Sequence, residues 1–225
     1  MFNAPWPALL IAVVIPLTYL LQTRVPEARQ EELFYTYGLI PQALEAGAWH
    51  GLVTSQFLHG NWAHALLNAV GALAFGAPAA RLLGLSFPRA AAFFAFYIVC
   101  GVTAGWAFAL LHPGELVVLA GASGAVSGLM GAAARLLERR GRLGPFFSRT
   151  VIAMTIAWVA VNLMVGLTGF APGSGGAPVA WEAHIAGYAA GLLLIGPWAA
   201  LFGKRWRRPP AYEETDPPEL IRGPE

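Results

Sequence analysis

The sequence predicts an all-α membrane protein whose chain crosses the bilayer six times. Of its 225 residues, 57% are hydrophobic and only 12% are charged, whereas a soluble domain carries about 25% charged residues. Apolar stretches recur along the chain, most of them near the length of about 20 residues that spans roughly 30 Å of hydrocarbon, and Gly and Pro punctuate their ends. An open β-sheet is excluded at membrane depth, because its edges would leave backbone groups unpaired.

Six stretches are expected to form the membrane helices. They are, approximately, Trp6–Gln22, Trp62–Leu83, Ala90–Leu111, Ser123–Leu137, Thr150–Thr168 and Ala183–Phe202. The fourth is short for a span. The first stretch holds no Lys or Arg and no convincing cleavage site, so we interpret it as a retained helix rather than a signal peptide.

Basic residues predict the direction of the spans, because Lys and Arg gather on the cytoplasmic side of membrane proteins. Twelve of the fourteen lie at or after the second, fourth and sixth stretches, and only Arg24 and Arg29 lie on the other side. Both termini should therefore be cytoplasmic. We expect residues 1–208 to form one membrane domain, followed by a disordered Pro- and Glu-rich tail over residues 209–225.

The segment after the first stretch, residues 23–61, is too long to be a simple connector. It carries several aromatic side chains, namely Tyr35, Tyr37, Trp49 and Phe57. Aromatic rings prefer the boundary between lipid and water, so we expect this loop to lie partly in the outer interface.

Ser123 opens the fourth stretch and His184 opens the sixth, and glycines flank both residues. Helix lengths place Ser123 about 6–12 Å below the outer surface. An ionisable group at such depth is costly and is therefore a functional candidate. If the two side chains meet, they form a nucleophile and its base. The free N–H groups at a helix N-terminus would stabilise an oxyanion beside Ser123.

Glycines favour a close approach of the fourth and sixth stretches, because small residues let two helix backbones touch in lipid. The expected helix-packing glycines are Gly121, Gly124, Gly128, Gly187 and Gly191. Ordinary helix packing requires the same residues, so they do not by themselves indicate a catalytic site. We expect Ser127 to bond back to its own helix backbone.

His64 and Asn68 lie four residues apart and share one face of the second stretch. They could donate hydrogen bonds to one oxyanion, or form a polar contact between helices. His59 is interpreted as a loop or turn histidine nearer the surface. Cys100 is expected to be a small buried residue, and the spacing of Cys and His predicts no metal site.

Together these motifs resemble the rhomboid family of intramembrane serine proteases, over the chain from Trp49 to Gly191. Three segments carry the resemblance in the family's order: residues 57–68, residues 121–124 around Ser123, and residues 183–187 around His184. The resemblance implies a Ser–His dyad without an acidic third member, in which Ser123 is the nucleophile and His184 the general base.

The same resemblance implies an oxyanion hole made by His64, Asn68 and the backbone N–H of Ser123. It also implies a serine endopeptidase that cleaves transmembrane protein substrates near the outer interface, without a cofactor. The fifth stretch, which contains Trp158, is similar to the family's mobile lateral gate.

The chain departs from many relatives at two positions. His50 follows Trp49 where an arginine is common, and Ser127 stands where a tyrosine usually supports the catalytic histidine. Another ring, such as that of Tyr188 or of a residue in the second stretch, is a candidate replacement for that tyrosine.

Two alternatives remain open. His64 and His184 on facing helices could ligate a haem, or the chain could bind a quinone. A catalytically inactive rhomboid-like protein could instead bind and escort membrane proteins. We expect lipid and transmembrane substrates as partners, no nucleic acid, and a place in a bacterial plasma membrane, which the high content of Ala, Gly, Pro and Arg fits.

Overall fold

The computed structural model describes residues 4–138, 142–169 and 178–203. These residues form helices joined by turns and loops, with one isolated antiparallel bridge between Leu39 and Leu119. The tail at residues 209–225, expected to be disordered, lies outside the described residues.

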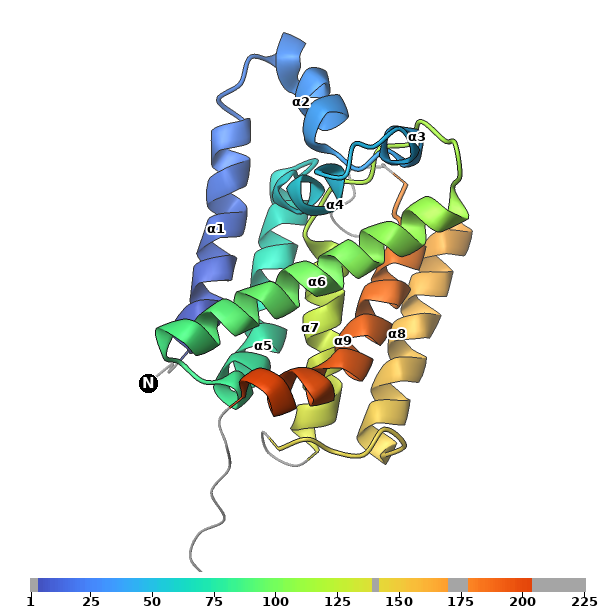
Figure 1. The fold of residues 1–225 in the computed structure, drawn as a ribbon. Helices are drawn as coiled ribbons and strands as arrows, with labels where there is room; N and C mark the ends of the chain where they lie inside the picture. The colour runs from blue at the N-terminus through green and yellow to red at the C-terminus, as the bar shows by residue number, and fades with distance from the viewer. Residues whose placement is uncertain (1–3, 139–141, 170–177, 204–225) are drawn as a thin grey trace, which may run out of the picture.

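Six long helices occupy the six expected stretches (Figure 1). They are α1 (Trp6–Gln22), α5 (Trp62–Leu83), α6 (Phe87–Leu111), α7 (Ser123–Leu137), α8 (Arg149–Thr168) and α9 (Trp181–Phe202). The largest difference is at α6, which begins three residues earlier than predicted. Pro88 is accommodated there because a proline suits the first turn of a helix, where its missing N–H has no partner to lose.

Four of these helices are each long and apolar enough to cross a membrane: α5, α6, α8 and α9. α1 meets the test only together with residues 27–37, which turn away from it by 110°. α7 has 15 residues and is therefore only about 22 Å long. The protein is thus an integral helical membrane protein, while the count of six spans remains a prediction.

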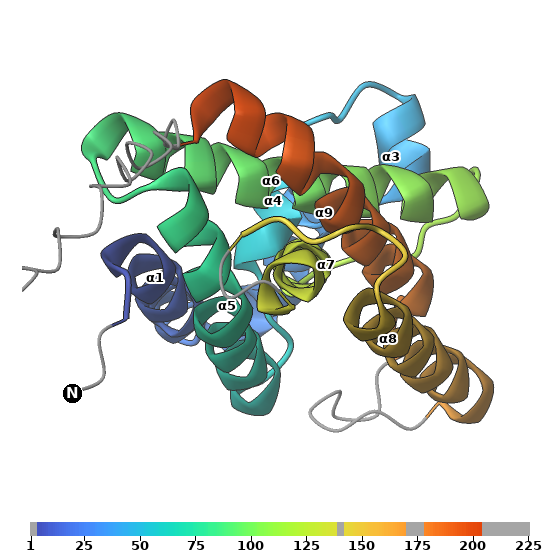
Figure 2. The same cartoon turned by 90° about the horizontal axis from the view of Figure 1, so that it is seen from below.

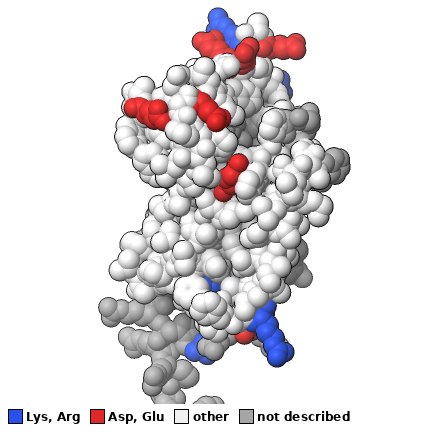
Figure 3. All heavy atoms as spheres, turned by 90° about the vertical axis from the view of Figure 1, so that its right-hand side faces the viewer, with Lys and Arg blue, Asp and Glu red and all other residues white. Residues whose placement is uncertain are grey.

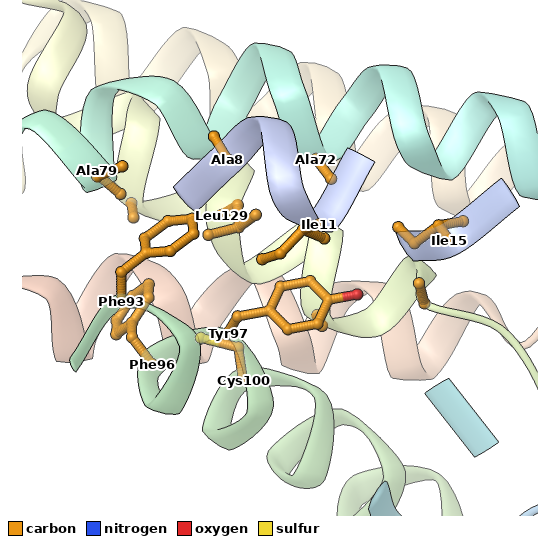
Figure 4. Packing of buried hydrophobic residues seen from close by; sticks show 14 of the residues in the cluster. Ala8, Ile11, Ile15, Ala72, Ala79, Phe93, Phe96, Tyr97, Cys100 and Leu129 are labelled. Carbon is orange, nitrogen blue, oxygen red and sulfur yellow. The ribbon is translucent and has the colours of Figure 1, made fainter. Parts of the chain in front are cut away.

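α7 lies in the middle of the bundle, in contact with α5, α6, α8 and α9 (Figure 2). The main apolar core fills the space between α1, α5, α6, α7 and α9. Figure 4 shows Ile11 of α1 beside Leu129 of α7 and Tyr97 of α6, with Ile15 further along α1. A buried central helix lets its first residue be enclosed by side chains from several neighbours.

Glycines bring the backbones of α7 and α9 into direct contact. A Cβ atom at Gly187 would collide with the carbonyl oxygen of Gly124, and one at Gly191 with that of Gly128. The prediction of a helix-packing role is wrong for Gly121, which precedes α7 and has a φ of +127°.

Short helices follow α1 and lie at one end of the bundle (Figure 1). They are η1 (Glu27–Arg29), α2 (Gln30–Tyr37), α3 (Pro41–Glu45), α4 (Gly51–Thr54) and η2 (Ser55–Phe57). His50, the residue in place of the common arginine, contacts the carbonyl oxygen of Thr36 through Nε2 at 2.9 Å. It therefore fastens α2 to the start of α4.

Charged side chains gather at the two ends of the molecule. Seen from the α8 side, acidic residues cluster at the end that carries the short helices, and most of the visible Lys and Arg lie at the other end (Figure 3). The first described residues of α1 and the end of α9 also lie at that basic end (Figure 1). The band between the two ends is largely uncharged, as a lipid-facing surface requires.

Candidate active site

Ser123 is the first residue of α7, as predicted, and a fixed loop leads into it. The N–H of Gly121 donates to the carbonyl of Ser55 at 2.9 Å, and the N–H of Ala122 donates to Nε2 of His59 at 3.4 Å. The first helical hydrogen bond runs from Val126 N–H to the Ala122 carbonyl. The Ser123 amide therefore belongs to the first turn, whose N–H groups have no acceptor within the helix.

His184 lies in the first turn of α9, and its Nε2 is 2.8 Å from Oγ of Ser123. The two residues are 61 positions apart in the chain. Both side chains are half-buried. A neutral imidazole with its lone pair on Nε2 accepts the hydroxyl proton in this geometry, which is the arrangement of a nucleophile and a general base.

The glycine contact between α7 and α9 explains how a short serine side chain reaches the histidine. Gly124 follows Ser123 directly, and Gly187 lies three residues after His184. Because the backbones touch at these glycines, Ser123 and His184 lie within one turn of the closest approach of the helices.

His64 lies on the same side of the α7 entrance as Ser123. A Cβ atom built on Gly121 would be 2.9 Å from His64 Nε2 and 3.8 Å from Ser123 Oγ. Glycine at position 121 thus serves two purposes, since it permits the positive φ and leaves room for the imidazole. Asn61 caps α5 by accepting from the His64 N–H at 2.8 Å, which fixes the first turn.

Asn68 is buried one turn further along α5. Its Nδ2 donates to the carbonyl oxygen of His64 at 3.0 Å. This bond is to the backbone of the preceding turn and not to the His64 imidazole. Because the amide carries two protons, a second proton remains for another acceptor.

His59 lies in a loop, as predicted, but it is fully buried rather than near the surface. Gln22 at the end of α1 holds it from both sides, donating to its carbonyl at 2.9 Å and accepting from its N–H at 3.1 Å. Burial lowers the pKa of His59 to about 4, so the ring is neutral at pH 7. Because Nε2 accepts the Ala122 N–H, that nitrogen carries no proton. The residue thereby fixes the loop in front of Ser123.

Two residues of α8 also surround His184, and neither was expected at the site from the sequence. Asn162 is buried, and its Oδ1 is 2.9 Å from His184 Nδ1. The ring of Trp158 lies 6.2 Å from the imidazole, between centroids, at an angle of 37°. Trp158 and Asn162 are four residues apart and therefore share one face of α8, and this spacing is the sequence pattern that could have indicated both.

The rings suggested as replacements for the missing tyrosine do not pack on His184. Tyr188 instead contacts the hydroxyl of Thr155 at 3.0 Å, and Trp158 takes the place beside the imidazole. Ser127 donates to the carbonyl of Ser123 at 2.7 Å, as predicted.

The described residues contain no group of three or more His, Cys, Asp or Glu side chains placed to hold a metal ion. Both ring nitrogens of His184 are engaged, one by Ser123 and the other by Asn162. A haem iron would have to displace one of these partners.

Fold and site together define a helical integral membrane protein with a serine and a histidine in contact at the ends of two touching helices. The family model for the rhomboid domain matches residues 46–199, well over half of the chain. The chain therefore belongs to the rhomboid family, whose members are generally serine intramembrane proteases. A comparison with curated proteins gives no match.

Proposed function

We propose that this protein is an intramembrane serine endopeptidase in which Ser123 is the nucleophile and His184 the general base. The observation that carries the proposal is the 2.8 Å contact between His184 Nε2 and Ser123 Oγ. Packing alone does not require a histidine opposite a serine inside a membrane bundle, where polar groups are costly.

The mechanism follows from this pair. Ser123 Oγ attacks a peptide carbonyl while Nε2 of His184 takes the hydroxyl proton. The resulting imidazolium then gives this proton to the leaving amine, which produces an acyl-enzyme. Water, deprotonated in turn by His184, hydrolyses the ester and returns the hydroxyl to Ser123.

The oxyanion is stabilised from two sides in this proposal. The Ser123 amide offers an N–H at the positive end of α7. The imidazole of His64, held close to Gly121, offers a second donor. Asn68 donates one amide proton to the backbone carbonyl of the preceding turn and has one further amide proton to give.

The proposed substrates are transmembrane segments with small or helix-destabilising residues near the outer membrane surface. A regular helix in lipid keeps its carbonyls bonded, so cleavage needs a segment that unwinds. Only 11% of the apolar window of α8 is buried, the smallest share among the four span candidates. This loose packing supports α8 as the route by which a substrate enters from the lipid.

The proposed orientation places both termini in the cytoplasm and Ser123 toward the outer face, and the proposed location is a bacterial plasma membrane. The basic end of the molecule in Figure 3 supports this orientation, because the start of α1 and the end of α9 lie there and basic residues favour the cytoplasmic side. The chemistry uses no cofactor.

The proposal is tested by reconstituting the full chain in lipid vesicles with a transmembrane substrate and measuring cleavage. Ser123→Ala and His184→Ala should each abolish turnover. Ser127→Ala is the matched control, because Ser127 lies one turn away and contacts only the Ser123 carbonyl among the hydrogen bonds described. Persistent cleavage by purified Ser123→Ala would exclude the assigned nucleophile.

A further inference from the structure

Asn162 is a buried polar residue on a helix that buries little else. Among the residues of α8, only Val151 and Asn162 are buried, and Asn162 is 3% exposed. Burying an amide costs free energy unless its donors and acceptor are satisfied. Both ends of this amide have partners, and one of those partners is the proposed catalytic base.

The partners determine which way the amide points. Nδ2 of Asn162 donates to the carbonyl oxygen of Trp158 at 2.9 Å. In the flipped amide, Oδ1 would face that carbonyl, and two acceptors would oppose each other. Oδ1 therefore faces Nδ1 of His184, at 2.9 Å.

This orientation also determines the tautomer of the imidazole. An amide oxygen only accepts, so Nδ1 of His184 must carry the proton. A neutral imidazole has a single N–H, which leaves the lone pair on Nε2. That nitrogen is the one 2.8 Å from Ser123 Oγ. The ring is thus held in the form that can accept the serine proton.

We propose that Asn162 is a positioning residue that completes the Ser123–His184 pair as an uncharged third member, an inference that rests on the proposed function. It holds His184 in the tautomer and rotation that a general base needs, as the carboxylate does in a Ser–His–Asp triad. When His184 takes the serine proton, the bond from Nδ1–H to Oδ1 persists and strengthens, because its donor becomes charged.

This arrangement depends on the position of α8, the helix that carries Asn162. α8 packs on α9 through several contacts: Val151 and Trp158 lie in one apolar cluster with Tyr188, and Gly166 sits against the Trp181 ring, 2.7 Å from it when a Cβ is added. The hydrogen bond between Thr155 and Tyr188 is only one of them, so its loss alone leaves α8 docked. Moving α8 away from α9 would remove the acceptor from Nδ1. The base is therefore complete only while α8 is docked.

The test compares Asn162→Leu, Asn162→Asp and the control Thr155→Val in the full chain reconstituted with a transmembrane substrate. Leucine has a similar volume and no acceptor, so in Asn162→Leu kcat should fall about 10²-fold with little change in KM. This loss is smaller than the ~10⁴-fold loss of kcat that a wrong histidine tautomer causes in a charged triad. Aspartate keeps an oxygen facing Nδ1 and, when its other oxygen carries a proton, still donates to the Trp158 carbonyl, so this variant should retain more activity than leucine. Thr155→Val also removes a side-chain hydrogen bond between α8 and α9, yet kcat should stay within about twofold.

A second readout is independent of variant folding. In wild-type protein labelled with ¹⁵N-histidine, the His184 signal, identified by its loss in His184→Gln, should report the Nδ1–H tautomer. An Nε2–H tautomer, or an Asn162→Leu enzyme as fast as wild type, would overturn the inference. A wild type that neither cleaves substrate nor reacts with a fluorophosphonate would instead overturn the proposed function, whatever the tautomer.

Discussion

Gly187→Ala is the substitution that should separate the catalytic pair without touching either residue. A Cβ at position 187 would lie 2.9 Å from the carbonyl carbon of Gly124 and closer still to its oxygen. Ordinary carbon contacts are near 3.5–4.0 Å, so α9 must move away from α7 by at least about 0.8 Å, and further to clear the oxygen. This movement would lengthen the contact between His184 Nε2 and Ser123 Oγ from 2.8 Å to about 3.6 Å or more, beyond hydrogen-bond range.

Both the catalytic rate and the stability of Gly187→Ala should fall. A misplacement of about 1 Å can cost ~10²-fold in rate, so kcat/KM for a transmembrane substrate should fall by about that factor. Overpacking costs about 1–3 kcal/mol of stability, which thermal unfolding in detergent would measure. Gly60→Ala is the control, because Gly60 is exposed and no atom lies within 4 Å of its added Cβ. Gly187→Ala with wild-type rate and stability would refute the close packing of α7 against α9.

Three further predictions concern the site. His64→Ala and Asn68→Ala should each lower kcat, by at most the 10²–10³-fold that loss of one oxyanion donor typically costs, and an unchanged rate in the double variant would remove both residues from the site. Because burial lowers the pKa of His59 from 6.5 to about 4, the unfolded chain binds the proton first as the pH falls. The free energy of unfolding should thus be highest above pH 6.5 and fall by about 3 kcal/mol toward pH 4. His59→Gln should flatten this part of the pH profile of unfolding. Cleavage should also decline at acidic pH, since His184 must be neutral to act as a base, and a rate that rises on acidification would contradict that role.

Most of the long helices could be predicted because hydropathy and Gly–Pro punctuation act locally. Ser123 begins α7 in both the prediction and the structure. α9 begins two residues before the predicted Ala183, so His184 is the fourth residue of the helix rather than the second. The contact between Ser123 and His184 was a hypothesis at that stage, because the sequence does not specify where two helices cross.

The supporting residues of the site could not be found from the sequence. The backbone of His59 is bonded to the side chain of Gln22, 37 residues earlier, and no local pattern connects the two. Asn162 meets His184 only because α8 docks on α9 with one particular rotation. The sequence spacing of Gly121 matches that of the helix glycines, but its positive φ belongs to the loop before α7.

The most direct test of the central claim is to locate a fluorophosphonate adduct on the intact protein by mass spectrometry. A serine activated by a neighbouring imidazole should be modified at Ser123, and His184→Ala should lose this adduct although Ser123 is still present. No adduct on the wild-type chain, or equal labelling in wild type and His184→Ala, would contradict the account.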